Sequence, residues 1–498
     1  MHTSLDTDHH GQAARTIFGF DALHDFQREV LAAIDAGRDC LAVSPTGSGK
    51  TLCYGVPAAM EMAKPPMNRS LVLVVSPLIA LMRDQAEKLG AKGIPVASFD
   101  SLQTRDDRDG LWQSLASGEA VVAFVSPERL SSLTFRERLA GMRKITLVAI
   151  DEAHCTSQWG FNFRPEYRHI GTFLDSFPGA VRLALTATAT PGIKADMIAN
   201  LKLRDPALVV SELVRDNLST SVTQATSVQD LPALIANAIS PETTLIYAPT
   251  RKDANTIWRD LRSRNLHAGI YHAGMEPGSR QASQRAFLSG NTGIMVATSA
   301  FGLGIDKADI RHVIHAGMPQ NIEQYVQETG RAGRDGKPAR CTMFFHLRDY
   351  HTRKFLIDRQ YPEVNMTRKV CEFIAGQLEG QDQYGKNRYW LLKQLAAKGT
   401  KSRDAEAALD YALRENLFRQ SEVLDPSSME SDLILTAGNR IEDSGAWWRQ
   451  YEYRRQEALW KLEQMRLFAR LAASSTSRGL AMLRNYFKDP SRDKSTNH

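Results

Sequence analysis

The stretch Ser44-Pro45-Thr46-Gly47-Ser48-Gly49-Lys50-Thr51 decides the fold of this 498-residue chain. It follows the apolar run Cys40-Leu41-Ala42-Val43 and leads into a segment that can continue as a helix. A strand, a Gly-rich turn and a helix N-terminus form an anion site, because unpaired backbone N–H groups of the first helical turn point at a bound phosphate. The pattern therefore predicts the phosphate-binding loop of a nucleotide site.

The side chains of this loop have separate expected roles. Lys50 reaches the terminal phosphates as a point charge, and the Thr51 hydroxyl ligates Mg²⁺. The strict pattern has Gly where this chain has Ser44, so the loop is a variant. A solvated Gly/Ser turn is the alternative, and the strand-to-helix context disfavours it. The predicted nucleotide contacts in the loop are Thr46, Gly47, Ser48, Gly49, Lys50 and Thr51.

Composition and charge set limits on the class of protein. No apolar run approaches the roughly 20 residues that span a bilayer, and the polar N-terminus has no signal-peptide pattern. The five cysteines are far apart and form no CxxC pair, which predicts free thiols in a reducing cytoplasm and no zinc site. The net charge of +6 is only a weak indication of a polyanionic partner.

Two side chains before the loop are candidate contacts of the nucleotide base. Phe20 can stack on a purine, and the Gln27 amide has both the donor and the acceptor that adenine requires. An ordinary amphipathic helix over residues 23–36 explains Gln27 equally well.

Short apolar runs alternate with helical patterns from residue 71 to residue 211. Such runs predict a parallel sheet buried on both faces, with ligands bound at the carboxyl ends of its strands. Asp151 and Glu152 come directly after one run, where Asp151 is expected to hold Mg²⁺ and Glu152 to act as general base. A pair of surface acids that begin a helix is the weaker alternative. The runs are Leu71–Val75, Val121–Val125, Leu147–Ile150 and Val181–Leu185.

An aromatic and basic segment follows these acids. Its members are the aromatic and basic residues Trp159, Phe161, Phe163, Arg164, Tyr167 and Arg168, while Gly160 and Pro165 argue against a regular helix. Exposed aromatic side chains with interleaved Arg stack on unpaired bases, each worth about 1–3 kcal/mol. A small hydrophobic cluster under a long loop is the alternative.

Together these motifs resemble the first motor lobe of the RecQ family of DNA helicases, in superfamily two. The resemblance covers roughly residues 18–347, and the aromatic segment is its most specific part. It implies two tandem RecA-like parallel-sheet lobes of the α/β class, followed by a mostly helical C-terminal region with a possible winged helix. The matching stretches of the first lobe are Phe26-Gln27, Pro45–Thr51, Ser76–Gln85, Ser126–Leu130, Asp151–His154, Gln158–Tyr167 and Leu185–Thr190.

The resemblance continues through the second lobe and assigns its residues. Arg331 and Arg334 would be arginine fingers, which can be worth on the order of 10³ in rate. Gln327 would couple nucleic-acid contact to hydrolysis, and Asp306 would meet the nucleotide sugar or its neighbours. The strand contacts carried over from the family, besides the aromatic segment, are Ser76, Pro77, Thr188, Thr250, Arg251, His272 and Thr298.

The resemblance implies an ATP- and Mg²⁺-dependent helicase that moves 3′ to 5′ on single-stranded DNA and unwinds forked DNA in repair or recombination. It also implies a cytoplasmic location; partner proteins are not indicated. Two alternatives stay open. One is an RNA-remodelling ATPase of the same superfamily, and the other is a DNA-stimulated ATPase that does not unwind processively.

The C-terminal part departs from the family pattern, because Cys371 is the only Cys after Cys341 and four zinc ligands cannot be assembled. We expect a metal-free helical hairpin packed through Leu462, Met465, Phe468 and Leu483. Helices near 390–395 and 405–415, with strands near 417–419 and 433–435, predict a winged helix or a plain helical spacer. The expected domains are a flexible 1–15, lobes at 16–212 and 213–350, the possible winged helix at 351–440, the hairpin at 441–488 and a flexible 489–498.

Overall fold

The structure is a computed structural model of the full chain. It describes residues 8–77, 79–100, 103–130, 132–157, 167, 170–301, 307–378, 383–386, 388–397, 402–415, 417–424, 431–437 and 444–488. The predicted contacts Trp159, Phe161, Phe163, Arg164 and Asp306 and the predicted flexible end 489–498 lie outside these residues. No helix among the described residues has the length and apolar character needed to cross a bilayer.

The chain divides into two compact units. The first comprises residues 1–345 together with 468–498, and the second comprises residues 346–467. The first unit contains both predicted parallel-sheet lobes, and each has its own sheet and core.

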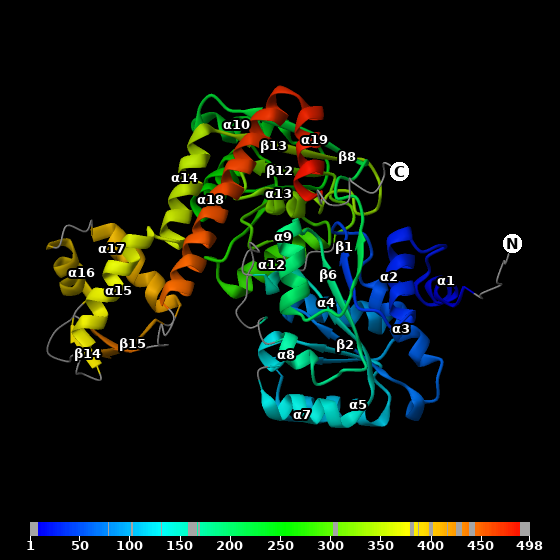
Figure 1. Ribbon diagram of the computed structural model, residues 1–498. Helices are drawn as coiled ribbons and strands as arrows, with labels where there is room; N and C mark the ends of the chain where they lie inside the picture. Colours follow the sequence, from blue (N-terminus) through cyan, green and yellow to red (C-terminus); the bar gives the residue numbers. More distant parts are fainter. Residues whose placement is uncertain are drawn as a thin grey trace, which may run out of the picture. The chain divides into compact units, whose positions relative to one another are not determined.

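The first lobe is built on a seven-stranded sheet in the order β3-β4-β2-β5-β6-β1-β7, with every pair parallel (Figure 1). Leu71, Leu73 and Val75 of β2 belong to one buried cluster, while Val72 and Val74 belong to another. Alternate residues thus enter cores on opposite faces, which is why this strand is apolar throughout. The strands are β1 Cys40–Val43, β2 Leu71–Val75, β3 Val96–Phe99, β4 Val122–Val125, β5 Ile145–Ile150, β6 Val181–Thr186 and β7 Ala207–Val210.

Helices cover both faces of this sheet. Side chains of α5 and α7 enter the first cluster, and side chains of α2, α3 and α4 enter the second. The described helices are α1 His9–Ala13, η1 Ala14–Phe18, α2 Asp25–Asp35, α3 Leu52–Met62, η2 Pro66–Asn68, α4 Ile79–Ala91, α5 Arg105–Ser117, α6 Pro127–Leu130, α7 Leu133–Met142, η3 Ala153–Thr156, α8 Ile170–Leu174 and α9 Pro191–Asn200.

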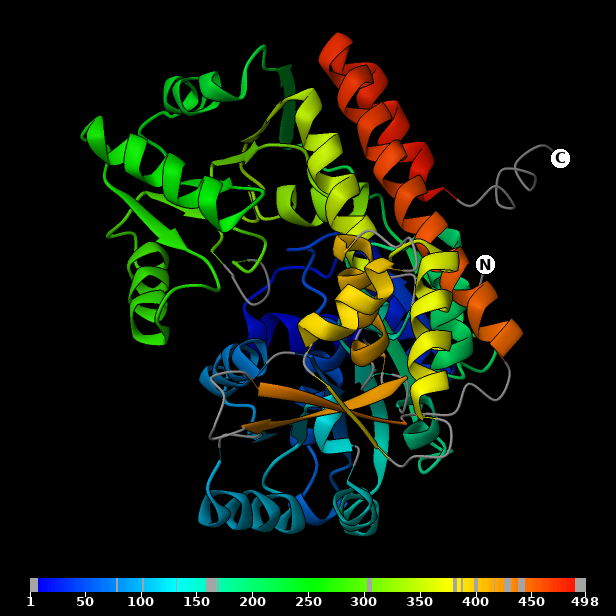
Figure 2. The ribbon, with the colours of Figure 1, turned by 90° about the vertical axis from the view of Figure 1, so that its left-hand side faces the viewer.

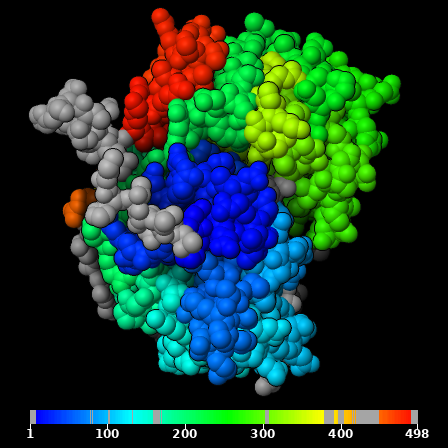
Figure 3. All heavy atoms as spheres, turned by 90° about the vertical axis from the view of Figure 1, so that its right-hand side faces the viewer, coloured from blue at the N-terminus to red at the C-terminus, as the bar shows by residue number. Residues whose placement is uncertain are grey.

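The N-terminal segment differs from the flexible 1–15 that the sequence predicts. Residues 9–13 form α1, and Asp8 caps it by accepting a hydrogen bond from the Gly11 backbone N–H. Ala14 is fully buried in the core of the first lobe. In Figure 3 the first part of the chain, in dark blue, lies against the lighter blue surface of the lobe. Capping and burial of a few small residues thus order a sequence whose polarity predicts disorder.

The second lobe has a six-stranded parallel sheet in the order β10-β11-β9-β12-β13-β8. Its two faces are covered by α10 and α11 on one side and by α12 on the other. The elements are β8 Leu218–Gln224, η5 Val228–Asp230, α10 Leu231–Ala238, β9 Thr244–Tyr247, α11 Arg251–Ser263, β10 Ala268–Tyr271, α12 Pro277–Leu288, β11 Ile294–Ala297, β12 His312–Ala316, α13 Ile322–Thr329 and β13 Ala339–Phe345.

The last helices return to the second lobe. Two helices, α18 Ser444–Ser474 and α19 Thr476–Phe487, meet at Ser475. Phe468 near the end of α18 packs against Tyr325 of α13, with ring centroids 4.9 Å apart. The four residues expected to pack this region, Leu462, Met465, Phe468 and Leu483, are buried. Within the described residues, no group of His, Cys, Asp or Glu is arranged as a metal site.

The second unit contains the helices and strands that the sequence places after the motor. Its three-stranded antiparallel sheet has the order β14-β16-β15 (Figure 2). Helices α16 and α17 and strands β15 and β16 lie where the sequence predicts two helices and two strands, and a winged helix stays a prediction. The elements before α18 are α14 Leu347–Gln360, α15 Val364–Leu378, β14 Gln383–Lys386, α16 Arg388–Ala397, α17 Ser402–Arg414, β15 Phe418–Leu424 and β16 Ser431–Ala437.

Candidate nucleotide site and nucleic-acid face

The predicted phosphate loop lies between β1 and α3, as the sequence pattern requires. Gly47 and Gly49 have φ angles of +83° and +74°, which side chains other than Gly rarely adopt. Lys50 donates from Nζ to the carbonyl oxygens of Ser44 and Pro45, at 2.7 and 3.0 Å. The ammonium group is therefore held inside the curl of the loop. Ser44, the departure from the strict pattern, contacts the Ser211 hydroxyl at 2.7 Å.

The loop has the polar atoms that a phosphate ligand needs. The hydroxyl oxygens of Thr46 and Ser48 are buried, and neither has a hydrogen-bond partner among the described residues. A buried hydroxyl without a partner costs about 1–3 kcal/mol. Thr51 donates from Oγ1 to Gln85 Oε1 at 2.9 Å, which leaves oxygen lone pairs for a cation. Phosphate oxygens with a bound Mg²⁺ fit this donor and acceptor set.

The two predicted acids stand beside the loop at the carboxyl end of β5. Burial, together with the neighbouring Glu152 charge, raises the pKa of Asp151 to about 7. Burial also raises the pKa of Glu152, although Lys50 and the two arginines Arg331 and Arg334 oppose the rise. Glu152 has a φ of +48°, a strained value for a residue with a side chain. Neighbouring carboxyl groups whose pKa values are raised in this way cluster at functional sites.

A polar chain connects Glu152 to the next strand, and the sequence analysis missed it. The buried His154 lies 3.3 Å from Glu152 Oε2 through Nδ1, and the same nitrogen is 2.9 Å from Thr186 Oγ1. Thr186 in turn donates to the Thr188 carbonyl at 3.2 Å. The predicted general base is thus linked through His154 to Thr188, a predicted strand contact.

The two predicted arginines lie on the turn between α13 and β13, and this turn faces the phosphate loop. A Cβ atom added at Gly47 would be 2.8 Å from Arg334 Cγ, and one added at Gly330 would be 2.3 Å from Thr46 Oγ1. Burial lowers the pKa of Lys50, the nearby acids oppose this, and Arg334 lowers it further. Lys50 and Arg334 therefore lie close enough to share one polyanionic ligand.

The Gln27 amide has a different partner from the expected adenine. Gln27 is buried, donates from Nε2 to the carbonyls of Ser48 and Gly49 at 3.2 and 3.1 Å, and accepts from the His24 N–H at 2.9 Å. In this structure its hydrogen bonds brace the phosphate loop. Phe20 is 51% exposed, so its ring is available for stacking.

Four of the predicted strand contacts lie together in the second lobe. Thr250 and Arg251 follow β9, His272 follows β10 and Thr298 follows β11, and these strands are neighbours in the sheet. A Cβ atom at Gly274 would be 3.3 Å from Arg251 Cδ and 3.4 Å from His272 Nδ1. Hydroxyl, imidazole and guanidinium groups gathered at the carboxyl ends of neighbouring strands can contact a phosphate backbone.

The first lobe places its predicted contacts at the ends of β2 and β6. Ser76 and Thr188 are buried, and the Ser76 hydroxyl has no partner among the described residues. Tyr167, the last residue of the predicted stretch Gln158–Tyr167, donates to the Asp151 carbonyl at 3.3 Å. Tyr167 is thereby joined to a predicted catalytic acid.

The chain matches two family models: DEAD/DEAH box helicase over residues 24–197 and helicase conserved C-terminal domain over residues 226–336. It is 37% identical over 348 residues to the ATP-dependent DNA helicase RecQ of Pasteurella multocida, covering 70% of this chain and 53% of that protein. It is also 37% identical over 348 residues to RecQ of Bacillus subtilis, covering 70% of this chain and 58% of that one. The motor lobes of this chain belong to the RecQ family.

The chain therefore spans little more than half the length of these RecQ relatives. Solved structures share the two-lobe fold at low sequence identity. The helicase MrfA bound to DNA and AMPPNP has a TM-score of 0.57 at 19% identity, covering 71% of this chain and 52% of its own. Mycobacterium smegmatis Lhr bound to single-stranded DNA and AMP-PNP has a TM-score of 0.54 at 20% identity, covering 86% and 60%.

Proposed function

We propose that this chain is an ATP-dependent DNA helicase that moves 3′ to 5′ along single-stranded DNA and unwinds forked duplexes in repair or recombination. The observation that carries the proposal is the contact between the phosphate loop of the first lobe and the arginine turn of the second. Family membership of both lobes supports the same activity.

The geometry supports a mechanism in which hydrolysis needs both lobes. Lys50 and the loop N–H groups hold the β- and γ-phosphates, and Glu152 orients the attacking water and accepts its proton. Arg331 and Arg334 neutralise charge that develops on the transferred phosphoryl group. Thr51 and Asp151 would hold Mg²⁺, which supplies further positive charge to the phosphates.

Loss of the γ-phosphate removes the anion that both lobes hold. We propose that this loosens the contact between Arg334 and the loop, while Thr250, Arg251, His272 and Thr298 keep their grip on one strand. Alternating grip by Ser76 and Thr188 on the first lobe then moves the protein along DNA.

Strand release from tailed duplexes tests the proposal. We expect ATP-dependent release from a 3′-tailed duplex and none from a 5′-tailed duplex. Single-stranded DNA should stimulate hydrolysis more than single-stranded RNA of the same sequence. Stimulated hydrolysis without release would support a DNA-stimulated ATPase instead, and equal stimulation by RNA would support an RNA-remodelling enzyme.

Variants of the site test the assigned roles. Lys50→Ala and Glu152→Gln should each lower hydrolysis by on the order of 10³ or more, and only Glu152→Gln should keep ATP affinity. Lys64→Ala is the matched control, because Lys64 is half exposed at the other end of α3 and pairs with Glu61. Hydrolysis at the wild-type rate by Glu152→Gln would remove Glu152 as the general base.

A further inference from the structure

The linker between the two lobes contains Arg215, a positively charged residue that belongs to none of the predicted motifs. Residues 211–217 join β7 of the first lobe to β8 of the second, and Arg215 lies near the end of this linker. Its guanidinium is half-buried, and burial lowers the pKa of Arg215 from its ordinary value. A cation that loses hydration is retained only where acceptors replace the water.

The acceptors are backbone carbonyls of the arginine turn. Arg215 donates from Nη1 to the Gly330 carbonyl at 3.2 Å and from Nη2 to the Gly333 carbonyl. Gly330 ends α13, so the guanidinium also faces the negative end of a helix. In the sequence, Gly330 and Gly333 stand on either side of Arg331, and Arg334 comes directly after Gly333.

Asn217 completes this arrangement. Its side-chain oxygen accepts from Arg215 Nε at 3.2 Å, and its Nδ2 donates to the carbonyls of Gly333 and Lys337 at 2.9 and 2.8 Å. Gly333 has a φ of +55°, and a Cβ there would be 2.6 Å from Asn217 Nδ2. The turn is thus held in a left-handed conformation by side chains that belong to the linker.

We propose that Arg215, oriented by Asn217, is a positioning residue that sets the arginine turn against the phosphate loop. This rests on the proposed hydrolysis of ATP. Any movement of the linker displaces the carbonyls on both sides of Arg331, so the linker couples the separation of the lobes to the position of the arginines. A displacement of about 1 Å in a catalytic group can cost as much as 10²-fold in rate.

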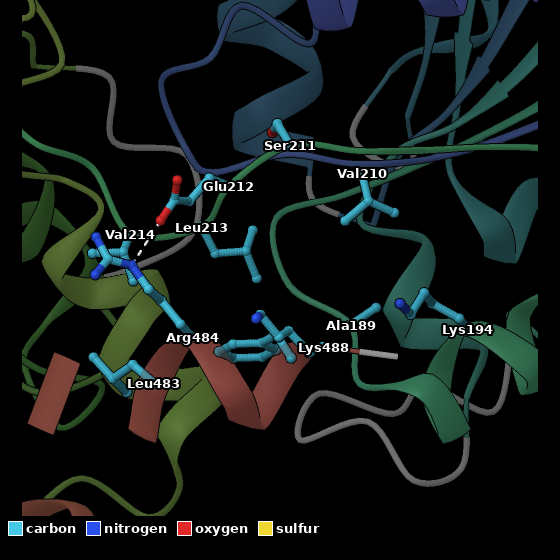
Figure 4. Close-up of a pocket in the computed structure, with 11 residues that line it drawn as sticks. Ala189, Lys194, Val210, Ser211, Glu212, Leu213, Val214, Leu483, Arg484 and Lys488 are labelled. Atoms are coloured by element: carbon cyan, nitrogen blue, oxygen red, sulfur yellow. Dashed lines mark hydrogen bonds and ion pairs between the residues drawn. The ribbon is translucent and has the colours of Figure 1, made fainter. Parts of the chain in front are cut away.

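The opposite end of the linker offers a matched control. Glu212 pairs with Arg484 of α19 at 2.8 Å, and both side chains are about half exposed. Figure 4 shows this pair beside a cavity of about 460 Å³, with Leu213 and Val214 of the linker in its wall. Arg484→Ala removes a linker contact without touching the turn, so its effect on hydrolysis should be small.

The test compares Arg215→Gln, Arg215→Lys and Arg484→Ala with wild type. For Arg215→Gln we expect kcat for DNA-stimulated ATP hydrolysis to fall about 10- to 100-fold, with little change in KM for ATP. Affinity for ADP with aluminium fluoride, which mimics the transferred phosphoryl group, should fall by a similar factor, while affinity for ADP alone stays. Arg215→Lys should lie between, since one ammonium group cannot bond both carbonyls as a guanidinium does.

A kcat within twofold of wild type for Arg215→Gln would overturn the proposal, as would equal losses of affinity for ADP and for the analogue. If Arg215→Gln does not fold, Arg215→Lys provides the test. Wild-type values of kcat and of affinity for the analogue in Arg215→Lys would then show that Arg215 does not position the arginine turn. Absence of hydrolysis in the wild-type protein would count against the proposed function instead. In that case the analogue affinities of the variants still test the role of Arg215.

Discussion

At the scale of single residues, the buried Asp39 shows how several partners stabilise one charged group. The carboxylate of Asp39 is fully buried and accepts from the Arg182 N–H and from the N–H and guanidinium of Arg204, at 2.8 to 2.9 Å. Burial acts to raise the pKa of Asp39, but the hydrogen bonds to Arg204 and Arg182 outweigh it and hold the pKa below its usual value. The carboxylate thus joins the start of β1 to β6 and to the segment before β7.

We expect Asp39→Asn to lower the free energy of unfolding by about 3 kcal/mol, because an amide cannot accept from all of these donors. Thermal or urea unfolding measures the loss. The control is Asp205→Asn, since Asp205 is 95% exposed where it pairs with Arg38. Equal stabilities of the two variants would contradict the structural role of Asp39.

A buried histidine predicts a dependence of stability on pH. Burial and the nearby Arg340 lower the pKa of His312 to about 4, and its Nε2 lies 2.8 Å from Thr342 Oγ1. The folded state therefore holds this imidazole neutral, whereas the unfolded chain protonates near 6.5. The contribution to stability is complete above pH 6.5 and is lost as the pH falls toward 4.

His312→Gln should therefore flatten the decline of the melting temperature between pH 8 and pH 5. His267→Gln, at an exposed position on the same lobe, is the control and should leave the wild-type decline unchanged. Parallel curves for His312→Gln and wild type would show that other groups set the acid sensitivity.

At the scale of elements, the close contact between α18 and α19 depends on one glycine. A Cβ added at Gly479 would lie 2.5 Å from Ala472 Cβ and 2.8 Å from its Cα. These distances are shorter than any real contact, so the two helices approach each other at a point where only hydrogen fits. The sequence gives no sign of this, since Gly479 lies within an amphipathic helical pattern.

Gly479→Ala should destabilise the protein by about 1–3 kcal/mol through overpacking. The control is Gly110→Ala, because Gly110 lies within α5 with open space around its Cα. There a methyl group should be neutral or stabilising by up to about 1 kcal/mol. Thermal unfolding of both variants gives the comparison, and a stable Gly479→Ala would mean that the helices separate easily.

At the scale of the whole molecule, the first unit is discontinuous in sequence. Residues 468–498 belong with residues 1–345, and the chain between them forms the second unit. Phe468 covers Tyr325, and α19 packs beside β8 (Figure 3, red). The end of α18 and helix α19 therefore pack on the second lobe.

A truncation after Phe345 should consequently destabilise the second lobe, although it keeps every strand of both sheets. We expect a lower melting temperature and faster proteolysis within residues 213–345 than in a chain that ends at Lys488. That longer truncation keeps all the contacts described above. Equal protease resistance of the two truncations would show that the second lobe is stable without α19.

The sequence by itself determined the local parts of this protein. The loop from Ser44 to Thr51, the acids after β5 and the short apolar strands follow patterns that backbone geometry and burial on both faces impose locally. The same reasoning predicted α16, α17, β15 and β16 of the second unit, but not α14, α15 or β14. It did not predict the N-terminal helix, because a small buried patch decides it, or the hydrogen bonds of Gln27 to the phosphate loop, because they join residues far apart in the sequence.

Only the tertiary structure decided what these parts do to one another. The approach of Arg334 to Gly47, the hold of Arg215 on Gly330 and Gly333, and the return of α19 to the second lobe join residues far apart in sequence. No local propensity encodes such contacts, since they arise when separately folded sheets and helices bury their remaining surfaces together. The chain thus specifies its phosphate loop residue by residue, but the pairing of that loop with the arginines depends on the assembled fold.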